Sequence, residues 1–229
     1  MSGSGQIVAI DCHVHTAASY DSQATIESVV RAAVKAPIDG FVVTDHDRIS
    51  AAHRAVPRAE AAGLIGIPGV EVSTADGHLL AIGVERRPAP GQSLAATIEN
   101  IRDDGGVAVI PHPFQRTRHG VHPTGTEDCD GVEVFNAHSF TGLRNRQAKR
   151  FATTSEYPQF GGSDAHRASV VGRGFTHVEV DVRDPTARDV VAAMRAGRTR
   201  PGGRPTPSWR YLGKLAESAR FRGGDISTR

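Results

Sequence analysis

Residues 6–15 read QIVAIDCHVH, an apolar run that ends in alternating polar side chains. The apolar and β-branched residues predict a buried strand over 6–12. Because successive side chains of a strand point to opposite faces, Asp11, His13 and His15 share one face. Two imidazoles two residues apart on one face can bind a single metal ion, and Asp11 is placed to orient one of them. Two buried histidines held by hydrogen bonds are the alternative for this stretch taken alone.

Outward from this strand, short β-branched runs alternate with alanine-rich stretches along the chain. The runs predict further strands at residues 38–43, 64–70, 78–84, 107–110, 131–135, 159–161 and 177–182. The alanine-rich stretches predict helices at residues 25–35, 50–62, 93–103, 141–153 and 184–196. Asp184 and Pro185 are expected to start the last helix, and Asp76-Gly77 predicts a hairpin between two strands. This alternation predicts a mostly parallel sheet, either open or closed into a barrel.

Four further strand ends also carry histidine or carboxylate side chains. They are Thr44-Asp45-His46-Asp47, Glu71 with His78 seven residues later, Pro111-His112-Pro113 and Asp164-Ala165-His166. A carboxylate flanked by valines, as Glu71 is, must be paired, ligated or protonated if it is buried. The carboxyl ends of parallel strands meet at one rim of a barrel. We therefore predict a multinuclear metal site at that rim, and its mixed imidazole and carboxylate donors suit Mn, Zn or Fe(II).

The order of these motifs resembles that of the PHP (polymerase and histidinol phosphatase) superfamily. The matching motifs are DxHxH, TDHD, GVEVS, GHLLAIG, Pro-His-Pro and SDAH, which run from Asp11 to His166. The resemblance implies an α/β fold, a distorted (β/α)7 TIM-like barrel with the metal site at the C-terminal rim of the strands. It also implies three divalent metal ions and, as in many members, hydrolysis of phosphoesters.

The resemblance further implies which side chains hold each metal ion. His13, His15 and Asp164 match the ligands of one ion, and Glu71 matches the bridging carboxylate. The remaining matches are His78 and His112 for a second ion, and Asp21, His46 and His166 for a third. This chain has Tyr20 between Ser19 and Asp21, where many members read Ser-Asp-Gly directly.

Such a centre would activate a water molecule, bridged between ions near Glu71, as the nucleophile of a hydrolysis. Guanidinium groups fit phosphate oxygens, so arginines that follow the metal motifs are candidates to bind substrate. The expected substrate contacts are Arg116, Arg118, Asn136 and Arg167, with Arg48 as a weaker candidate. His138 is a candidate general acid, and Asp11 and Asp47 are expected to support the ligands from behind.

Charge is distributed unevenly along the 229 residues. Residues 198–229 carry eight basic and two acidic side chains, whereas the rest carries 19 basic and 23 acidic ones. We expect a metal-dependent hydrolase barrel at 1–197, followed at 198–229 by a linker, Pro201–Pro207, and a basic tail. The tail could bind nucleic acid, although no nucleic-acid-binding motif supports this, and a solvated segment is the alternative.

Other functional classes fit the sequence less well. No apolar run approaches the ~18–20 residues that cross a bilayer, and no basic leader precedes residue 6, so we expect a cytoplasmic protein without membrane contact. Two cysteines, Cys12 and Cys129, exclude a disulfide framework and a cysteine-only metal site.

The sequence therefore favours a metal-dependent phosphoesterase acting on a small phosphomonoester, a nucleotide or an oligonucleotide end. A metal-dependent amidohydrolase is the first alternative, but no lysine ends a predicted strand, where such enzymes often carry one. A non-catalytic, metal-binding regulatory module is the second alternative, and the complete ligand set weighs against it.

Overall fold

A computed structural model describes residues 5–124, 127–139 and 142–205 of the chain. One nine-stranded sheet runs through these residues in the order β7-β6-β5-β4-β3-β2-β1-β8-β9. The strands are β1 (Gln6–Val14), β2 (Gly40–Val43), β3 (Ile65–Thr74), β4 (Gly77–Ile82), β5 (Val107–Ile110), β6 (Gly131–Asn136), β7 (Gln159–Gly162), β8 (Gly174–Val180) and β9 (Thr199–Gly203). The helices are α1 (Ile26–Lys35), α2 (Ser50–Ala61), α3 (Leu94–Asp103), α4 (Leu143–Thr154) and α5 (Ala187–Arg195), with the short 3-10 helices η1 (Arg116–Arg118) and η2 (Ala168–Val170).

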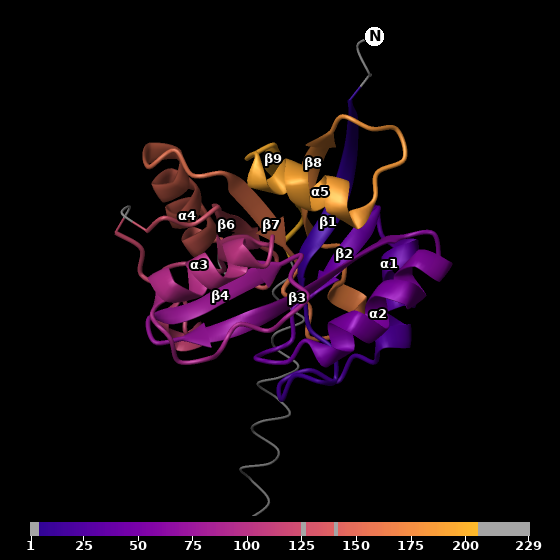
Figure 1. Cartoon of the computed structure of the whole chain (residues 1–229), viewed down its shortest axis with the longest axis horizontal. Coiled ribbons are helices and arrows are strands. Elements are labelled where there is room, and N and C mark those ends of the chain that lie inside the picture. Colours follow the sequence, from indigo (N-terminus) through magenta and orange to yellow (C-terminus); the bar gives the residue numbers. More distant parts are fainter. Residues whose placement is uncertain (1–4, 125–126, 140–141, 206–229) are drawn as a thin grey trace, which may run out of the picture.

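The sheet curls until its two ends nearly meet. The Thr176 hydroxyl in β8 accepts a hydrogen bond from the Gly161 backbone N–H in β7 and donates one to the Gly161 carbonyl, both at 2.9 Å. A Cβ on Gly174 would overlap the carbonyl oxygen of Gly162, so this seam closes only with glycine there. The expected α/β barrel is therefore observed as a nearly closed, barrel-shaped sheet (Figure 1).

The expectation of a mostly parallel sheet was wrong for the described strands. The pairs β1–β2, β2–β3, β5–β6 and β6–β7 are parallel, but β1–β8, β3–β4, β4–β5 and β8–β9 are antiparallel. The predicted hairpin at Asp76-Gly77 is one cause, because it turns β4 back along β3, and the Thr74 hydroxyl donates to the Gly77 carbonyl at 2.5 Å. The described residues thus hold nine strands rather than seven regular strand–helix units.

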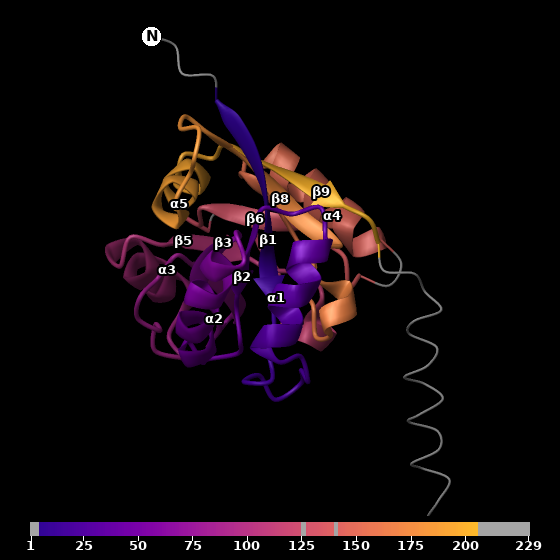
Figure 2. The same cartoon turned by 90° about the vertical axis from the view of Figure 1, so that its right-hand side faces the viewer.

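Apolar side chains fill the barrel and the spaces beneath the helices. Val8 and Ile10 of β1, Ile82 of β4, and Val190 and Met194 of α5 belong to one buried cluster. Two further clusters lie under the other helices, one beneath α1 and α2 and one beneath α3 and α4. Figures 1 and 2 show α1 and α2 on one flank of the sheet, away from α4. The α5 helix packs chiefly against β8, which neighbours β1 in the sheet.

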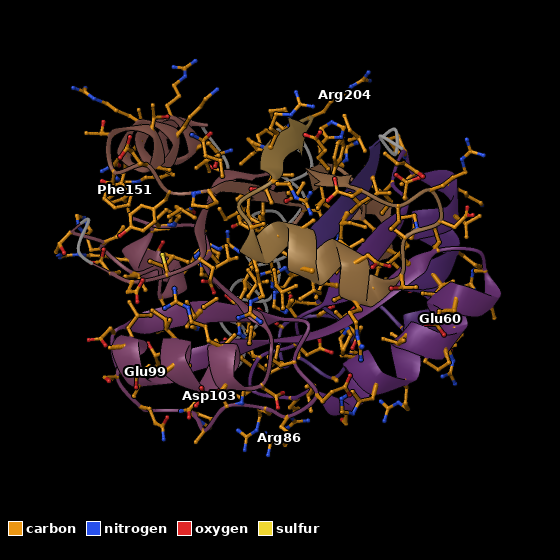
Figure 3. All side chains as sticks on the ribbon, turned by 45° about the horizontal axis from the view of Figure 1, so that its top comes forward. Glu60, Arg86, Glu99, Asp103, Phe151 and Arg204 are labelled. Carbon is orange, nitrogen blue, oxygen red and sulfur yellow. The ribbon has the colours of Figure 1, made fainter. Side chains whose placement is uncertain are left out.

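Charged side chains cover the outside of these helices. Glu60 of α2 and Glu99 and Asp103 of α3 point outward, as does Arg86 in the segment before α3 (Figure 3). None of the helices in the described parts of the chain combines the length and apolarity that a bilayer crossing requires.

The last helix begins later than the sequence suggested. Its N-cap is Thr186, not Asp184, and the helix starts at Ala187. Thr186 and Asp189 cap each other: the Asp189 N–H donates to the Thr186 hydroxyl, and the Asp189 carboxylate accepts from the Thr186 N–H at 2.9 Å. This reciprocal capping box satisfies two backbone donors, whereas a cap at Asp184 would satisfy one.

The predicted linker at Pro201–Pro207 was wrong over its first residues. Thr199–Gly203 form β9, which pairs antiparallel with β8. Pro201 is tolerated because β9 is the last strand in the sheet order, and an edge strand needs no second row of amide donors. The division into a barrel and a basic tail stays a prediction, and residues 206–229 of the tail lie outside the described residues.

Candidate metal centre

Strand ends deliver the predicted ligands to one place. β1 carries His13 and is followed by His15, and the backbone N–H of His15 donates to the Ala165 carbonyl at 2.9 Å. This contact joins the first motif to the last one along the chain. His46 and Glu71 form a single parallel β-bridge outside the regular pairing, which brings the segment after β2 beside the middle of β3.

Glu71 lies at the centre of the cluster and is 1% exposed. Its two oxygen atoms face different histidines. Oε1 lies 2.9 Å from Nδ1 of His78 and 3.1 Å from Nε2 of His112. Oε2 lies 3.2, 3.3 and 3.4 Å from Nδ1 of His46, Nε2 of His15 and Nε2 of His13. One buried carboxylate therefore has five imidazoles around it.

Asp164 presents one oxygen atom to the cluster and the other away from it. Oδ1 lies 3.3 Å from Nδ1 of His166, and 3.6 and 3.7 Å from Nε2 of His15 and His13. Oδ2 accepts a short hydrogen bond from the Arg118 guanidinium and another, at 2.9 Å, from the Asn136 amide. These two donors fix the carboxylate with Oδ1 facing the histidines.

Asp21 completes the cluster from the loop after β1. Its Oδ2 lies 2.7 Å from Nε2 of His166 and 3.4 Å from Nε2 of His46. Partial burial opposes ionisation of Asp21, but hydrogen bonds from both histidines outweigh it and hold the pKa of this carboxyl well below its usual range. The carboxylate is thus ionised beside two imidazole nitrogens.

Protonation differs among the buried groups: nearby carboxylates outweigh burial and raise the pKa of His13, His46 and His166, whereas His15 and Glu71 already have the forms that bind metal. Burial lowers the pKa of His15 to about 4, so this imidazole is neutral and its lone pair is available. Burial alone would raise the pKa of Glu71, but the surrounding imidazoles hold it well below its usual range. Neutral imidazoles and ionised carboxylates are the forms that bind divalent metal ions.

Several buried polar atoms of the cluster lack hydrogen bonds, and its donor atoms lie close together. Four buried donor or acceptor atoms of the cluster have no partner in hydrogen-bonding geometry, although three of them lie within 3.3 Å of a Glu71 oxygen or a His166 nitrogen: Nδ1 of His46, His78 and His112, and Oδ1 of Asp164. Such orphaned atoms are costly in a protein interior. All nine predicted ligands belong to groups of three or more donor atoms that lie within 4.8 Å of one another. The residues therefore fit bound divalent cations.

Glu133 is a member of the site that the sequence analysis missed. It is 2% exposed in β6, and its Oε1 accepts a hydrogen bond from Nδ1 of His13 at 3.1 Å. Its Oε2 accepts from the His112 backbone N–H at 2.9 Å and from the Asn136 amide at 2.8 Å. Because Nδ1 of His13 carries the proton, Nε2 is left as the metal-binding atom. The signal was present, since Glu133 is flanked by two valines as Glu71 is.

Asp11 has a different role from the one expected. Its carboxylate accepts hydrogen bonds from the backbone N–H groups of Ser163 and Gly172, at 2.9 and 2.8 Å, rather than from an imidazole. Burial raises the pKa of Asp11 to about 6. Strand alternation predicted the face on which the Asp11 side chain lies. It could not predict that backbone N–H groups after β7 would donate hydrogen bonds to this carboxylate. Asp47 likewise holds backbone, accepting from the Ser73 N–H at 2.8 Å.

The predicted substrate contacts lie in different places. Arg118 and His138 line a 260 Å³ cavity over the cluster, together with Tyr20 and His119. Asn136 is buried behind the cavity against Asp164, as described above.

Two of the predicted arginine contacts lie outside this cavity. Arg116 is exposed and lines a neighbouring hollow instead. Arg167 is exposed before η2 and, like Arg48, is not among the described residues that line either hollow.

His138 reaches the cavity as a neutral imidazole. Its Nδ1 lies 3.3 Å from the Asp164 carbonyl oxygen, which can only accept, so Nδ1 carries the proton. Burial lowers the pKa of His138 to about 4. His138 also belongs to a donor group with Asp164 and His166, which the sequence analysis did not include among the metal ligands.

Family models match most of the described chain. A model described as the PHP domain matches residues 11–140, and one described as PHP-associated matches residues 142–199. An uncharacterized protein of Methanocaldococcus jannaschii is 29% identical over 149 residues, which cover 60% of this chain and 87% of that protein.

Solved structures share the fold at lower identity. A two-domain Bacteroides vulgatus protein containing a predicted PHP-like metal-dependent phosphoesterase has a TM-score of 0.71 and 20% identity, covering 87% of this chain and 66% of that one. PsfC from Pseudomonas syringae has a TM-score of 0.68 and 21% identity, covering 95% of this chain and 99% of that one. A lesion-specific endonuclease from Pyrococcus furiosus has a TM-score of 0.57 and 17% identity, covering 86% of this chain and 58% of that one.

These likenesses agree with the geometry of the site. The barrel-shaped sheet, the ordered motifs at its strand ends and a PHP-domain match over more than half of the residues point to the same relatives. The chain belongs to the PHP family.

Proposed function

We propose that this chain is a metal-dependent phosphoesterase that hydrolyses a small phosphomonoester, a nucleotide or an oligonucleotide end. The observation that carries the proposal is the ionised, buried Glu71 with five imidazoles around it, directly beneath an open 260 Å³ cavity. The phosphoesterase named among the structures of similar fold adds support at the level of the family.

The proposed cofactors are three divalent ions, of manganese, zinc or iron. The proposed ligands are His13, His15, Asp21, His46, Glu71, His78, His112, Asp164 and His166. When bound, such ions supply a water nucleophile at neutral pH and offset negative charge on phosphoryl oxygens.

The chain's own residues would position the phosphate over this centre. Arg118 is held against Asp164 and also lines the cavity, so its guanidinium can meet a bound phosphate without moving far. His138 lines the same cavity and is the proposed donor of a proton to the leaving group. Because its imidazole is neutral, it would first have to take up a proton, for example from the attacking water, and then pass it on. Asn136 would act indirectly, by holding Asp164 and Glu133 in place.

The test is inorganic phosphate release from a panel of phosphomonoesters and nucleotides. We expect release that requires Mn²⁺, Zn²⁺ or Fe²⁺, stops with a chelator, and is lost in the double variant His13→Ala/His15→Ala. The matched control is His53→Ala, because His53 is a half-exposed histidine of α2 outside the cavity lining and should be dispensable. Absence of release from folded, metal-loaded protein across the panel would count against the proposal.

The same panel separates the alternatives. An amidohydrolase would cleave amide substrates and leave phosphoesters intact. The lysine that such enzymes often carry at a strand end is not found near the cavity, because the described lysines, Lys35 and Lys149, lie in α1 and α4. A regulatory module would bind metal and turn over neither class. Nucleic acid is a proposed partner because of the endonuclease of similar fold and the basic composition of residues 206–229.

A further inference from the structure

Tyr20 is exposed at the mouth of the metal centre. Its side chain is 82% exposed, more than any other large hydrophobic residue in the described parts of the chain. One face of its ring is stacked on the His46 ring, with centroids 5.0 Å apart and planes 20° apart. The ring is thus fixed over a proposed metal ligand, and its other face is open to solvent.

A second hollow lies beside the cavity over the cluster. Its volume is 420 Å³, and it shares Tyr20, His78 and His119 with that cavity. Hollows of roughly 300–1,000 Å³ are the size that usually holds small ligands in proteins. Tyr20 therefore belongs to both spaces, and a ligand could extend from the metal centre into the second hollow along its ring.

Polar and cationic groups line this hollow. Ser73 and Thr74 come from the end of β3, and Arg116 comes from η1. Among the described residues, the Arg116 guanidinium has no ion pair, so its charge is available to an anionic ligand. The carboxylate in the lining, Asp76, already accepts a hydrogen bond from the Leu94 N–H at 2.7 Å.

We propose that Tyr20 and this hollow form a nucleobase subsite, so that the substrate is a nucleotide. The inference rests on the proposed function, since it places the scissile phosphate at the metal centre and the base on the open face of Tyr20. Any of the nucleobases can stack on an aromatic ring, because each has a flat π-face. The positive charge of Arg116 favours an anionic nucleotide over a neutral aromatic compound.

The experiment compares two ligands that differ only in the base. Adenosine monophosphate and ribose phosphate, each as its non-hydrolysable phosphonate analogue so that it is bound but not cleaved, are titrated calorimetrically into full-length protein loaded with Mn²⁺. We expect adenosine monophosphate to bind roughly 10-fold more tightly, the size of effect that one stacked base produces. Tyr20→Ala should remove this difference by weakening only the nucleotide, whereas Tyr20→Phe should keep it because the ring is retained.

The results of this experiment distinguish the nucleobase subsite from the phosphoesterase activity on which it rests. Equal binding of the two ligands by the unaltered protein, or a difference that persists in Tyr20→Ala, would overturn the nucleobase subsite and leave the phosphoesterase proposal standing. Failure of both ligands to bind would overturn the nucleobase subsite, and the phosphoesterase proposal would then be decided by phosphate release from the substrate panel. Equal metal content and equal melting temperature in the variants show that the substitution has not acted through Asp21 or the fold.

Discussion

Two glutamates in identical sequence settings do different work in this centre. Glu71 and Glu133 each stand between two valines in a buried strand. Glu71 points both oxygen atoms at imidazole nitrogens, whereas Glu133 accepts hydrogen bonds from His13, from the His112 backbone and from Asn136. Glu133 thereby sets which nitrogen of His13 faces the cluster, a role that governs metal affinity without contact with the metal.

Glu133→Gln should weaken metal binding about 10- to 100-fold, as loss of such a supporting carboxylate usually does. Gln has one acceptor oxygen, so it cannot accept from both His13 and the His112 backbone, and its amide must face one of these donors. Competition with a chromogenic chelator measures the affinity. The matched control is Glu85→Gln, since Glu85 is 78% exposed. Unchanged affinity in Glu133→Gln would refute the assigned role.

His138 should matter most for substrates with poor leaving groups. Removing a general acid, as in His138→Asn, slows cleavage of an alkyl phosphate by about 10²–10⁴-fold, because the departing alkoxide needs a proton. A nitrophenyl phosphate leaves as a stable anion and should be affected far less. Steady-state rates on the two substrates check this, and an equal loss on both would show that His138 acts in binding or metal ligation instead.

Among the elements, β9 is the last described strand and lies at one end of the sheet. It pairs with β8 from Thr199 to Gly203, and the Gly202 backbone lies against the Phe175 ring. Removal of β9 would expose this ring and the edge of β8 together. Residues 206–229 lie outside the described residues, and the effect predicted for them rests on their basic composition.

Two truncations separate these roles. Ending the chain after Arg198 should lower the free energy of unfolding by several kcal/mol, since each lost backbone hydrogen bond contributes about 0.5–1.5 kcal/mol. Ending it after Pro205 should leave the melting temperature unchanged. If the basic tail binds nucleic acid, this longer form should also show weaker, less salt-dependent cleavage of oligonucleotides. Identical melting curves for the two truncations would contradict the structural role of β9.

At the scale of the whole molecule, the sequence predicted the site better than the sheet. Strand ends gather at one rim, which predicted that the histidine and carboxylate motifs would lie together. The individual ligands, Asp21 among them, came from the PHP resemblance, and all nine side chains lie in overlapping groups of donor atoms. Strand direction depends on how each connection folds back, which is why the antiparallel pairs of β8 were missed. β9 was missed because its Pro and Gly residues resemble a linker and only an edge position accommodates them.

The role of Asp11 shows the limit of pattern alone. Alternation along β1 gives the face on which the Asp11 side chain lies, but its partners, Ser163 and Gly172, come from the segments that follow β7 and η2, more than a hundred residues away. The same holds for Asn136, which was expected at the substrate and is found buried against Asp164. Arg118 lines the cavity as expected, but its contact with Asp164 was not predicted. Long-range contacts of this kind follow from the closure of the barrel.

We propose that the cluster around Glu71 binds the metal on which phosphoester hydrolysis depends. The most direct test is the metal content of protein loaded with Mn²⁺ or Zn²⁺ and then dialysed, measured by plasma mass spectrometry beside phosphate release from the same samples. We predict about three ions per chain in the unaltered protein and in His53→Ala, and loss of bound metal and phosphate release together in His13→Ala/His15→Ala. If the unaltered protein is folded but holds no more metal than the double variant, the cluster around Glu71 does not bind the metal.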